Sequence, residues 1–138
     1  MEPVNEGGCM CGAIRYAVQG QPRYAVMCHC DSCRRAAGSP VVAWASFSLE
    51  RFTILRGEPS KFQSSPSVTR TFCASCGTSL TASRADRPDD IGITICSLDH
   101  PEVFPPNHHS FMGDKISWMR LDDGLPAYRR YPGAPDNA

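Results

Sequence analysis

The sequence lacks a long apolar run, an excess of charge of either sign and an apolar leader. Its longest hydrophobic stretch, residues 41–45, is far shorter than the roughly 20 residues that a membrane-spanning helix needs. Fourteen basic and fourteen acidic side chains cancel, so no net field draws the chain to nucleic acid or an anionic membrane. The first eight residues do not resemble a secretory signal. We therefore expect a cytoplasmic protein with small-molecule partners and with no nucleic-acid or membrane partner.

Internal repeats and low-complexity linkers are also absent from the sequence. A chain of 138 residues in which 41% of the side chains are hydrophobic has the length and composition of one globular domain. We expect a single domain over residues 1–138, with its core at about residues 6–130 and a frayed C-terminal tail that includes Pro132–Pro135.

Short segments rich in β-branched and aromatic residues recur between glycines, prolines, serines and aspartates, a pattern that predicts a mainly β fold. Residues 12–18 alternate, so that Ile14, Tyr16 and Val18 share one face of a half-buried strand. Further strands are expected at residues 23–27, 41–47, 51–55, 68–72, 79–82 and 91–96. Short strands at this spacing predict a folded β-sheet or a sandwich.

One short helix is expected among these strands, at residues 32–37. Asp31 is a favourable N-cap because its carboxylate can accept hydrogen bonds from the free N–H groups of the first turn. Gly38 and Pro40 follow the segment and are typical of a helix end. We therefore expect about two turns of helix and the role of a cap for Asp31, rather than that of a catalytic base.

Eight cysteines stand out in a chain without a secretory signal. Seven of them fall into three tight groups, Cys9-x-Cys11, Cys28-x-Cys30-x-x-Cys33 and Cys73-x-x-Cys76. A disulfide between such near neighbours as Cys9 and Cys11 would be strained, whereas two thiolates can readily face one ion. The spacing therefore predicts zinc binding, with iron in a four-thiolate site as the alternative.

The seven clustered thiols divide into a set of four and a set of three. Three cysteines within six residues can converge on one ion, whereas each separate pair must find another pair. We expect about two zinc ions per chain, a structural one held by Cys9, Cys11, Cys73 and Cys76 and a second held by Cys28, Cys30 and Cys33. The second ion either keeps a position open to an incoming thiol or is closed by Cys96, His29, His100, His108 or His109.

Three side chains near these groups have more than one interpretation. Cys96 lies in the predicted strand 91–96, where a free cysteine behaves as a small buried hydrophobe. Arg34 and Arg35 directly follow the second cysteine cluster. A guanidinium there could offset the charge of a zinc ion with three thiolates or bind a substrate carboxylate, or both arginines could be solvated helix residues.

At these motifs the chain resembles the glutathione-dependent formaldehyde-activating enzyme family, which includes centromere protein V-type domains. The resemblance extends in order over nearly the whole chain. The matching segments are residues 8–16, 28–35, 38–40, Trp44, 70–78, 95–99, 109–111, 115–118 and 123–126.

The resemblance implies a fold similar to that of the mammalian suppressor of Sec-four and the same division of the cysteines into two zinc sites. It implies that Cys28, Cys30 and Cys33 hold the zinc with a catalytic role. The implied activity is a reversible carbon–sulfur lyase reaction, in which glutathione and formaldehyde give S-hydroxymethylglutathione. We therefore expect an enzyme that adds a small thiol such as glutathione to formaldehyde or a related carbonyl, with a non-catalytic zinc-stabilised binding module as the alternative.

Overall fold

The computed structural model describes residues 2–135, and its strands form two sheets. The smaller sheet consists of β1 (Val4–Gly8), β2 (Arg15–Gln19) and β5 (Phe52–Arg56). The larger sheet consists of β3 (Tyr24–Cys28), β4 (Val42–Ser48), β6 (Ser60–Ser65), β7 (Val68–Phe72), β8 (Ser79–Arg84), β9 (Arg87–Thr94) and β10 (His108–Ser110). The predicted mainly β fold is confirmed. The last residues of the tail predicted to fray, 136–138, lie outside the described residues.

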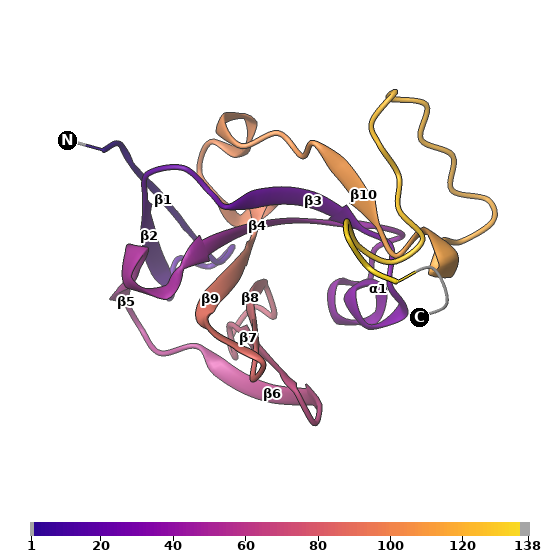
Figure 1. Cartoon of the computed structure of the whole chain (residues 1–138). Helices are drawn as coiled ribbons and strands as arrows, with labels where there is room; N and C mark the ends of the chain where they lie inside the picture. Colours follow the sequence, from indigo (N-terminus) through magenta and orange to yellow (C-terminus); the bar gives the residue numbers. More distant parts are fainter. Residues whose placement is uncertain (1, 136–138) are drawn as a thin grey trace.

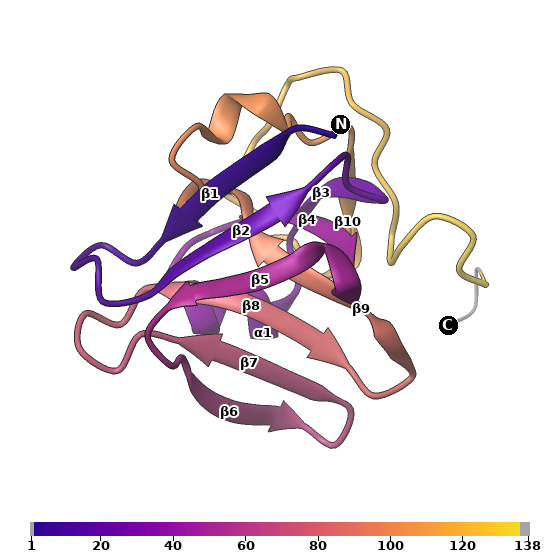
Figure 2. The ribbon, with the colours of Figure 1, turned by 90° about the vertical axis from the view of Figure 1, so that its left-hand side faces the viewer.

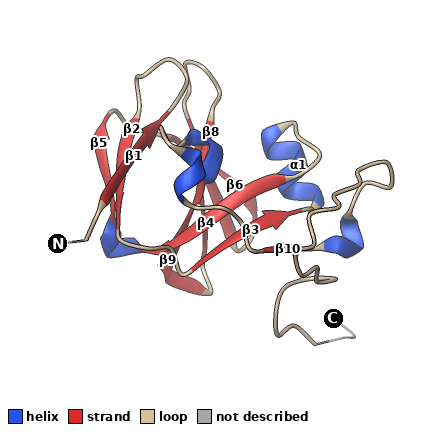
Figure 3. Cartoon of the chain, turned by 90° about the horizontal axis from the view of Figure 1, so that it is seen from above, coloured by secondary structure: helices blue, strands red, loops and turns tan. Residues whose placement is uncertain are grey.

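The strand order is β1–β2–β5 in the smaller sheet and β10–β3–β4–β9–β8–β7–β6 in the larger one. Neighbouring strands pair antiparallel, except that β10 pairs with β3 in parallel. The smaller sheet lies at one end of the molecule, and β10 lies toward the other (Figures 1 and 3). Because of this order, the N-terminal strands lie at one end of the molecule. Residues 108–110 lie beside Cys28, the last residue of β3.

The core lies between the two sheets, and Figure 2 shows the smaller sheet in front of part of the larger one. The alternation predicted for residues 12–18 is confirmed, because Ile14, Tyr16 and Val18 are all buried. Phe47 of β4 and Ile93 of β9 are also fully buried and belong to the same cluster. The inner face of the larger sheet therefore packs against the smaller sheet. Its outer face is available for a functional site.

The helix α1 (Asp31–Ala37) forms where it is predicted but begins one residue earlier. Its N-cap is Cys30, whose sulfur accepts a hydrogen bond from the backbone N–H of Cys33. Asp31 lies inside the first turn and pairs with Arg35, so the prediction of Asp31 as the cap is wrong. No helix in the described part of the chain is both long and apolar enough to cross a bilayer.

Three strands, β1, β6 and β10, were not expected from the sequence. The β1 segment contains two glycines and the β6 segment is largely polar, so neither has the apolar alternation that marks a strand. Both β1 and β6 are edge strands, and Gly7 is the one buried residue in them. They form because a neighbouring strand offers a row of backbone hydrogen-bonding groups rather than because they bury apolar surface.

The strand predicted at residues 91–96 ends earlier than expected. The β9 strand stops at Thr94, and residues Ile95–Ser97 form the 3₁₀ turn η2. In this turn Ile95 is buried and Cys96 is exposed, so the prediction that Cys96 is a buried hydrophobe is wrong. Further 3₁₀ turns are η1 (Leu49–Arg51), η3 (Pro101–Val103) and η4 (Met112–Asp114).

Candidate metal centres

Four sulfur atoms from two distant turns gather in a first cluster. Cys9 and Cys11 lie in the turn between β1 and β2, and Cys73 and Cys76 lie in the turn between β7 and β8. These two turns lie at the same edge of the molecule (Figure 2). The four sulfur atoms all lie within 4.8 Å of one another, so the structure brings together the four cysteines that the sequence places in one site.

The two turns of this first cluster differ in length, but each ends in a glycine with a positive φ angle. Gly12 follows Cys11 with φ 82°, and Gly77 follows Cys76 with φ 81°, a conformation that favours glycine. The N–H of Gly12 donates to the carbonyl of Cys9, and the N–H of Gly77 donates to the carbonyl of Cys73. The turn at residues 73–77 has the Cys-x-x-Cys-Gly form of a zinc knuckle, and the shorter turn at residues 9–12 brings its two sulfurs to the same cluster.

The sulfur separations in the first cluster fit a metal ion. Cys9 and Cys11 have their sulfurs 3.6 Å apart, and those of Cys11 and Cys73 are 3.7 Å apart. A tetrahedral zinc ion with Zn–S bonds of about 2.3 Å requires sulfurs about 3.8 Å apart, whereas a disulfide requires about 2.0 Å. All eight cysteines are free. Hydrogen bonds from the Thr78 hydroxyl and backbone lower the pKa of Cys76 to about 5, which favours the thiolate that a metal binds.

A second cluster forms where β3 passes into α1. Cys28 is the last residue of β3, Cys30 caps the helix, and Cys33 lies in its first turn. Their three sulfurs lie within 4.8 Å of one another. Cys28 and Cys33 are buried, and Cys30 is half-buried. Among residues 2–135, no histidine or carboxylate joins these three sulfurs as a fourth donor.

Arg70 of β7 contacts this second cluster and was missed by sequence reasoning. Its two terminal nitrogens lie 3.7 and 3.8 Å from the sulfur of Cys33. Its guanidinium also lies over the Trp44 ring, 6.0 Å from the centroid. Hydrogen bonds with Cys28 and Cys30, together with the charge of Arg70, lower the pKa of Cys33 to about 2. Strand register could have revealed Arg70, but its partner lies 37 residues earlier in the chain.

Neither Arg34 nor Arg35 supplies the compensating charge considered from the sequence. Arg34 donates from Nε to the carbonyl of His29 and from a terminal nitrogen to the carbonyl of Asp114. Arg35 is exposed and pairs with Asp31 within the helix. Arg34 therefore links the segment between Cys28 and Cys33 to η4. Among the described residues, Arg70 is the arginine that bonds to a cysteine sulfur.

The histidines that could have closed the second site are used elsewhere. His29 and His109 are buried, with Nε2 of His29 2.9 Å from Nδ1 of His109. Nε2 of His109 lies 2.9 Å from Oδ2 of Asp123. His108 is hydrogen-bonded to its neighbour Asn107, while His100 and Cys96 are exposed. The structure therefore groups none of these five residues with Cys28, Cys30 and Cys33.

A cavity of about 550 Å³ opens directly onto the second cluster, and all three of its cysteines line the wall. The floor is a row of cross-strand neighbours on the outer face of the larger sheet, in the order Tyr24, Ser46, Gly92, Ala82 and Arg70. The three central members are small, so the sheet face is hollowed between a tyrosine and an arginine. Phe111, Tyr131 and Pro132 of the C-terminal part add an apolar wall.

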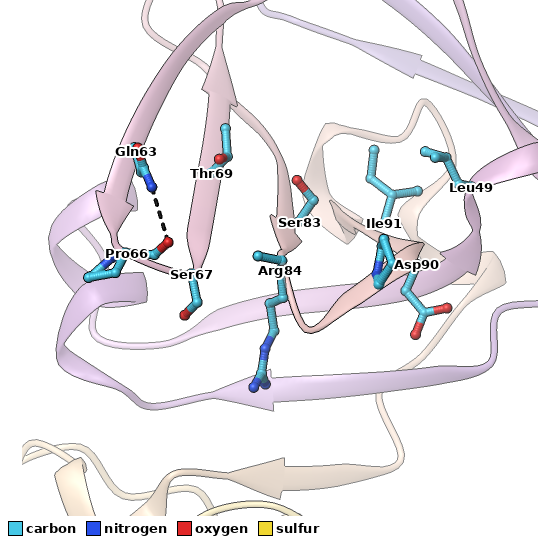
Figure 4. A pocket seen from close by; sticks show the side chains of 11 residues that line it. Leu49, Gln63, Pro66, Ser67, Thr69, Ser83, Arg84, Asp90 and Ile91 are labelled. Carbon is cyan, nitrogen blue, oxygen red and sulfur yellow. Dashed lines mark hydrogen bonds between the residues drawn. The ribbon is translucent and has the colours of Figure 1, made fainter.

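A smaller cavity of about 250 Å³ lies beside the β6–β7 and β8–β9 hairpins (Figure 4). Gln63 donates there to the carbonyl of Pro66 at 3.1 Å. Among the described residues that line it there is no cysteine or histidine. The larger cavity is therefore the candidate functional site.

Comparisons with known proteins indicate the family of the chain. The family model described as glutathione-dependent formaldehyde-activating enzyme matches residues 4–114. An uncharacterized lyase of Schizosaccharomyces pombe is 35% identical over 80 residues, which are 56% of this chain and 56% of that protein. A putative glutathione-dependent formaldehyde-activating enzyme of Halomonas elongata is 26% identical over 144 residues, covering 96% of this chain and 90% of the relative.

Among solved structures, the crystal structure of a Rhodobacter sphaeroides protein resembles the chain with a TM-score of 0.58 and 26% sequence identity. The similarity covers 68% of this chain and 87% of that one. The family match spans both cysteine clusters and all ten described strands. The chain therefore belongs to the glutathione-dependent formaldehyde-activating enzyme family.

Proposed function

We propose that the protein is a zinc-dependent carbon–sulfur lyase that reversibly adds a small, glutathione-like thiol to formaldehyde or a related small carbonyl. The observation that carries the proposal is the cavity onto which Cys28, Cys30 and Cys33 all open. The family to which the chain belongs and the names of its relatives support the same reaction class.

Two zinc ions are part of this proposal, and the cysteines fit them. Cys9, Cys11, Cys73 and Cys76 would hold a structural ion that fixes a turn near the N-terminus to a turn in the middle of the sequence. Cys28, Cys30 and Cys33 would hold the second ion next to the cavity. When bound there, zinc supplies an electrophilic centre that keeps a thiol deprotonated near neutral pH.

The reaction joins the sulfur of the thiol to the carbonyl carbon. The S–H bond breaks, a C–S bond forms, and a proton is delivered to the carbonyl oxygen, so neither reactant is oxidised. The reverse step breaks the same C–S bond. The chain must therefore bring two small molecules together and stabilise the negative charge that develops on oxygen.

The residues around the cavity suit both tasks. Val26, Ala82 and Phe111 line it with apolar surface, which lowers the local dielectric and strengthens each polar contact. Arg70 directs its N–H groups toward the sulfur of Cys33 at the cavity floor. We assign Arg70 to offset the charge of the thiolates and to stabilise the developing oxyanion.

The test is the rate at which the zinc-loaded protein brings glutathione and ¹³C-labelled formaldehyde to equilibrium with their adduct, measured by NMR exchange. We expect acceleration above the spontaneous rate for the unmodified protein and only the spontaneous rate for Cys30→Ser. Cys96→Ser is the matched control, because Cys96 is an exposed cysteine outside both clusters. An unmodified protein that holds about two zinc ions and gives no acceleration would instead support the non-catalytic binding module.

A further inference from the structure

The cavity beside the second cluster is much larger than the proposed carbonyl requires. Formaldehyde is close in size to a water molecule, whose share of liquid volume is about 30 Å³. The cavity has a volume of about 550 Å³, within the range typical of sites that enclose a whole small metabolite. Most of its lining is therefore available to contact parts of a reactant other than the reacting carbon and sulfur.

The charges that line the cavity are mostly positive. Within residues 2–135, the lining contains four arginines, Arg70, Arg84, Arg87 and Arg130, and one acidic residue, Asp90. Asp90 is paired with Arg23, which is not among the lining residues. The single negative charge of the lining is thus neutralised from outside.

Two of the four arginines have partners already. Arg70 bonds to the sulfur of Cys33, and a zinc ion with three thiolates has one net negative charge, which this guanidinium offsets. Arg84 forms a bidentate ion pair with Asp86 in the same hairpin. In the described part of the chain, Arg87 and Arg130 form no ion pair, although both line the cavity.

The two unpaired arginines come from different walls. Arg87 begins β9 and is paired in register with Arg84 across the β8–β9 turn. Arg130 belongs to the C-terminal segment, where its carbonyl accepts a hydrogen bond from Phe111 and its guanidinium stacks on Tyr131, 5.3 Å from the ring centroid. Stacking leaves the planar N–H edge of the guanidinium free to bind an anion.

We propose that Arg87 and Arg130 are the residues that bind a carboxylate of a reactant in this cavity, while its reacting end lies at Cys28, Cys30 and Cys33. This inference rests on the proposed function and adds the two residues that select a reactant by its charge. The carboxylate can belong to the thiol or to the carbonyl compound. In both cases an S–H adds across a C=O, the C–S bond forms, the proton passes to oxygen, and the carboxylate is unchanged.

The experiment is a calorimetric measurement of Kd on the zinc-loaded protein with two matched pairs of probes. In the thiol arm, 3-mercaptopropionate is compared with its neutral analogue 3-mercaptopropanol. In the carbonyl arm, glyoxylate is compared with neutral glycolaldehyde. The same measurements are made on Arg87→Gln, Arg130→Gln and Arg35→Gln, the last of which removes an exposed charge from the helix that carries Cys33.

We expect the charged probe to bind more tightly than its neutral analogue by about tenfold or more in at least one arm, the size of a charged hydrogen bond. This preference should shrink in Arg87→Gln and Arg130→Gln, should persist in Arg35→Gln, and should weaken as salt is added. Affinity for the neutral probe should not change. The arm that shows the preference identifies which reactant carries the carboxylate.

Equal affinity for charged and neutral probes in both arms would overturn the inference, as would a preference that survives both substitutions in the cavity. The two proposals can fail separately. Charge-selective binding without accelerated adduct formation would contradict the lyase activity alone. Accelerated adduct formation without any charge preference would contradict the carboxylate site alone.

Discussion

The guanidinium of Arg70 lies 3.7 and 3.8 Å from the sulfur of Cys33, although Arg70 belongs to β7, Cys33 belongs to α1 and the two residues are 37 positions apart. This contact joins β7, the strand next to the edge strand β6 of the larger sheet, to the first turn of α1 in the second cysteine cluster. It places a fixed positive charge where three thiolates meet, so the cluster has a counter-charge before any ion or substrate arrives.

The first prediction concerns this contact. Replacing Arg70 with Gln should weaken zinc binding at the second cluster by about tenfold or more, because a charged hydrogen bond to Cys33 is lost. Arg70→Lys should retain part of the affinity, since it keeps the charge without the planar fork. Competition with a chelator measures the effect, and the first cluster serves as the internal control. Equal loss of both ions would show that Arg70 acts on the fold instead.

The second prediction concerns the first cluster. Cys76→Ser should leave the chain largely unfolded, because structural zinc sites bind with about 10–16 kcal/mol and a domain is stable by only about 5–15 kcal/mol. Thermal unfolding with metal analysis measures this effect. Cys96→Ser should leave the melting temperature unchanged, since that thiol is exposed and belongs to neither cluster. A folded, cooperative Cys76→Ser protein would argue against a structural role for the first site.

The third prediction concerns alkaline pH. Burial raises the pKa of Tyr16 to about 12 from its ordinary value of 10.0. The folded state therefore holds this proton more tightly than the unfolded state, so the contribution to stability is full below pH 10.0 and is lost as the pH rises toward about 12.

Denaturant unfolding at several pH values should show this decline in the unmodified protein and a smaller one in Tyr16→Phe. Tyrosinate absorbance should show one of the four tyrosines titrating late. A full tyrosinate signal near the ordinary pKa, with the fold intact, would contradict burial of this hydroxyl.

The fourth prediction concerns the buried histidines. Hydrogen bonds from the backbone of Leu125 and from His109 lower the pKa of Asp123, so its carboxylate is ionised and can only accept. Nε2 of His109 must then carry a proton, its Nδ1 must accept, and Nε2 of His29 must donate. Nitrogen-15 NMR should find both rings with hydrogen on Nε2 alone. A proton on Nδ1 of His29 would contradict the chain of hydrogen bonds.

Much of this architecture could be predicted from the sequence because local patterns encode it. Alternation placed Ile14, Tyr16 and Val18 in the core, and cysteine spacing grouped seven thiols into two sets before any contact was known. Two segments without such a pattern, β1 and β6, became strands because neighbouring strands offered backbone partners. The residue pattern of a single segment does not show whether that segment pairs with the edge strand of a sheet.

The parts of the site that could not be predicted depend on register between distant strands. Arg70 reaches the cavity because it follows Ala82 and Gly92 in one row across the sheet. Cys96 is exposed because β9 ends at Thr94 and is followed by a 3₁₀ turn. The arginines next to the cluster in sequence, Arg34 and Arg35, point to other partners, which shows that proximity along the chain is a poor guide to charge compensation.

Metal analysis of the purified protein beside its Cys30→Ser variant tests the central claim most directly. If the two clusters bind separate zinc ions, the unmodified chain contains about two zinc ions and the variant contains about one, with the melting transition of the fold retained. A folded, metal-free protein whose clustered cysteines are joined as disulfides would contradict the account.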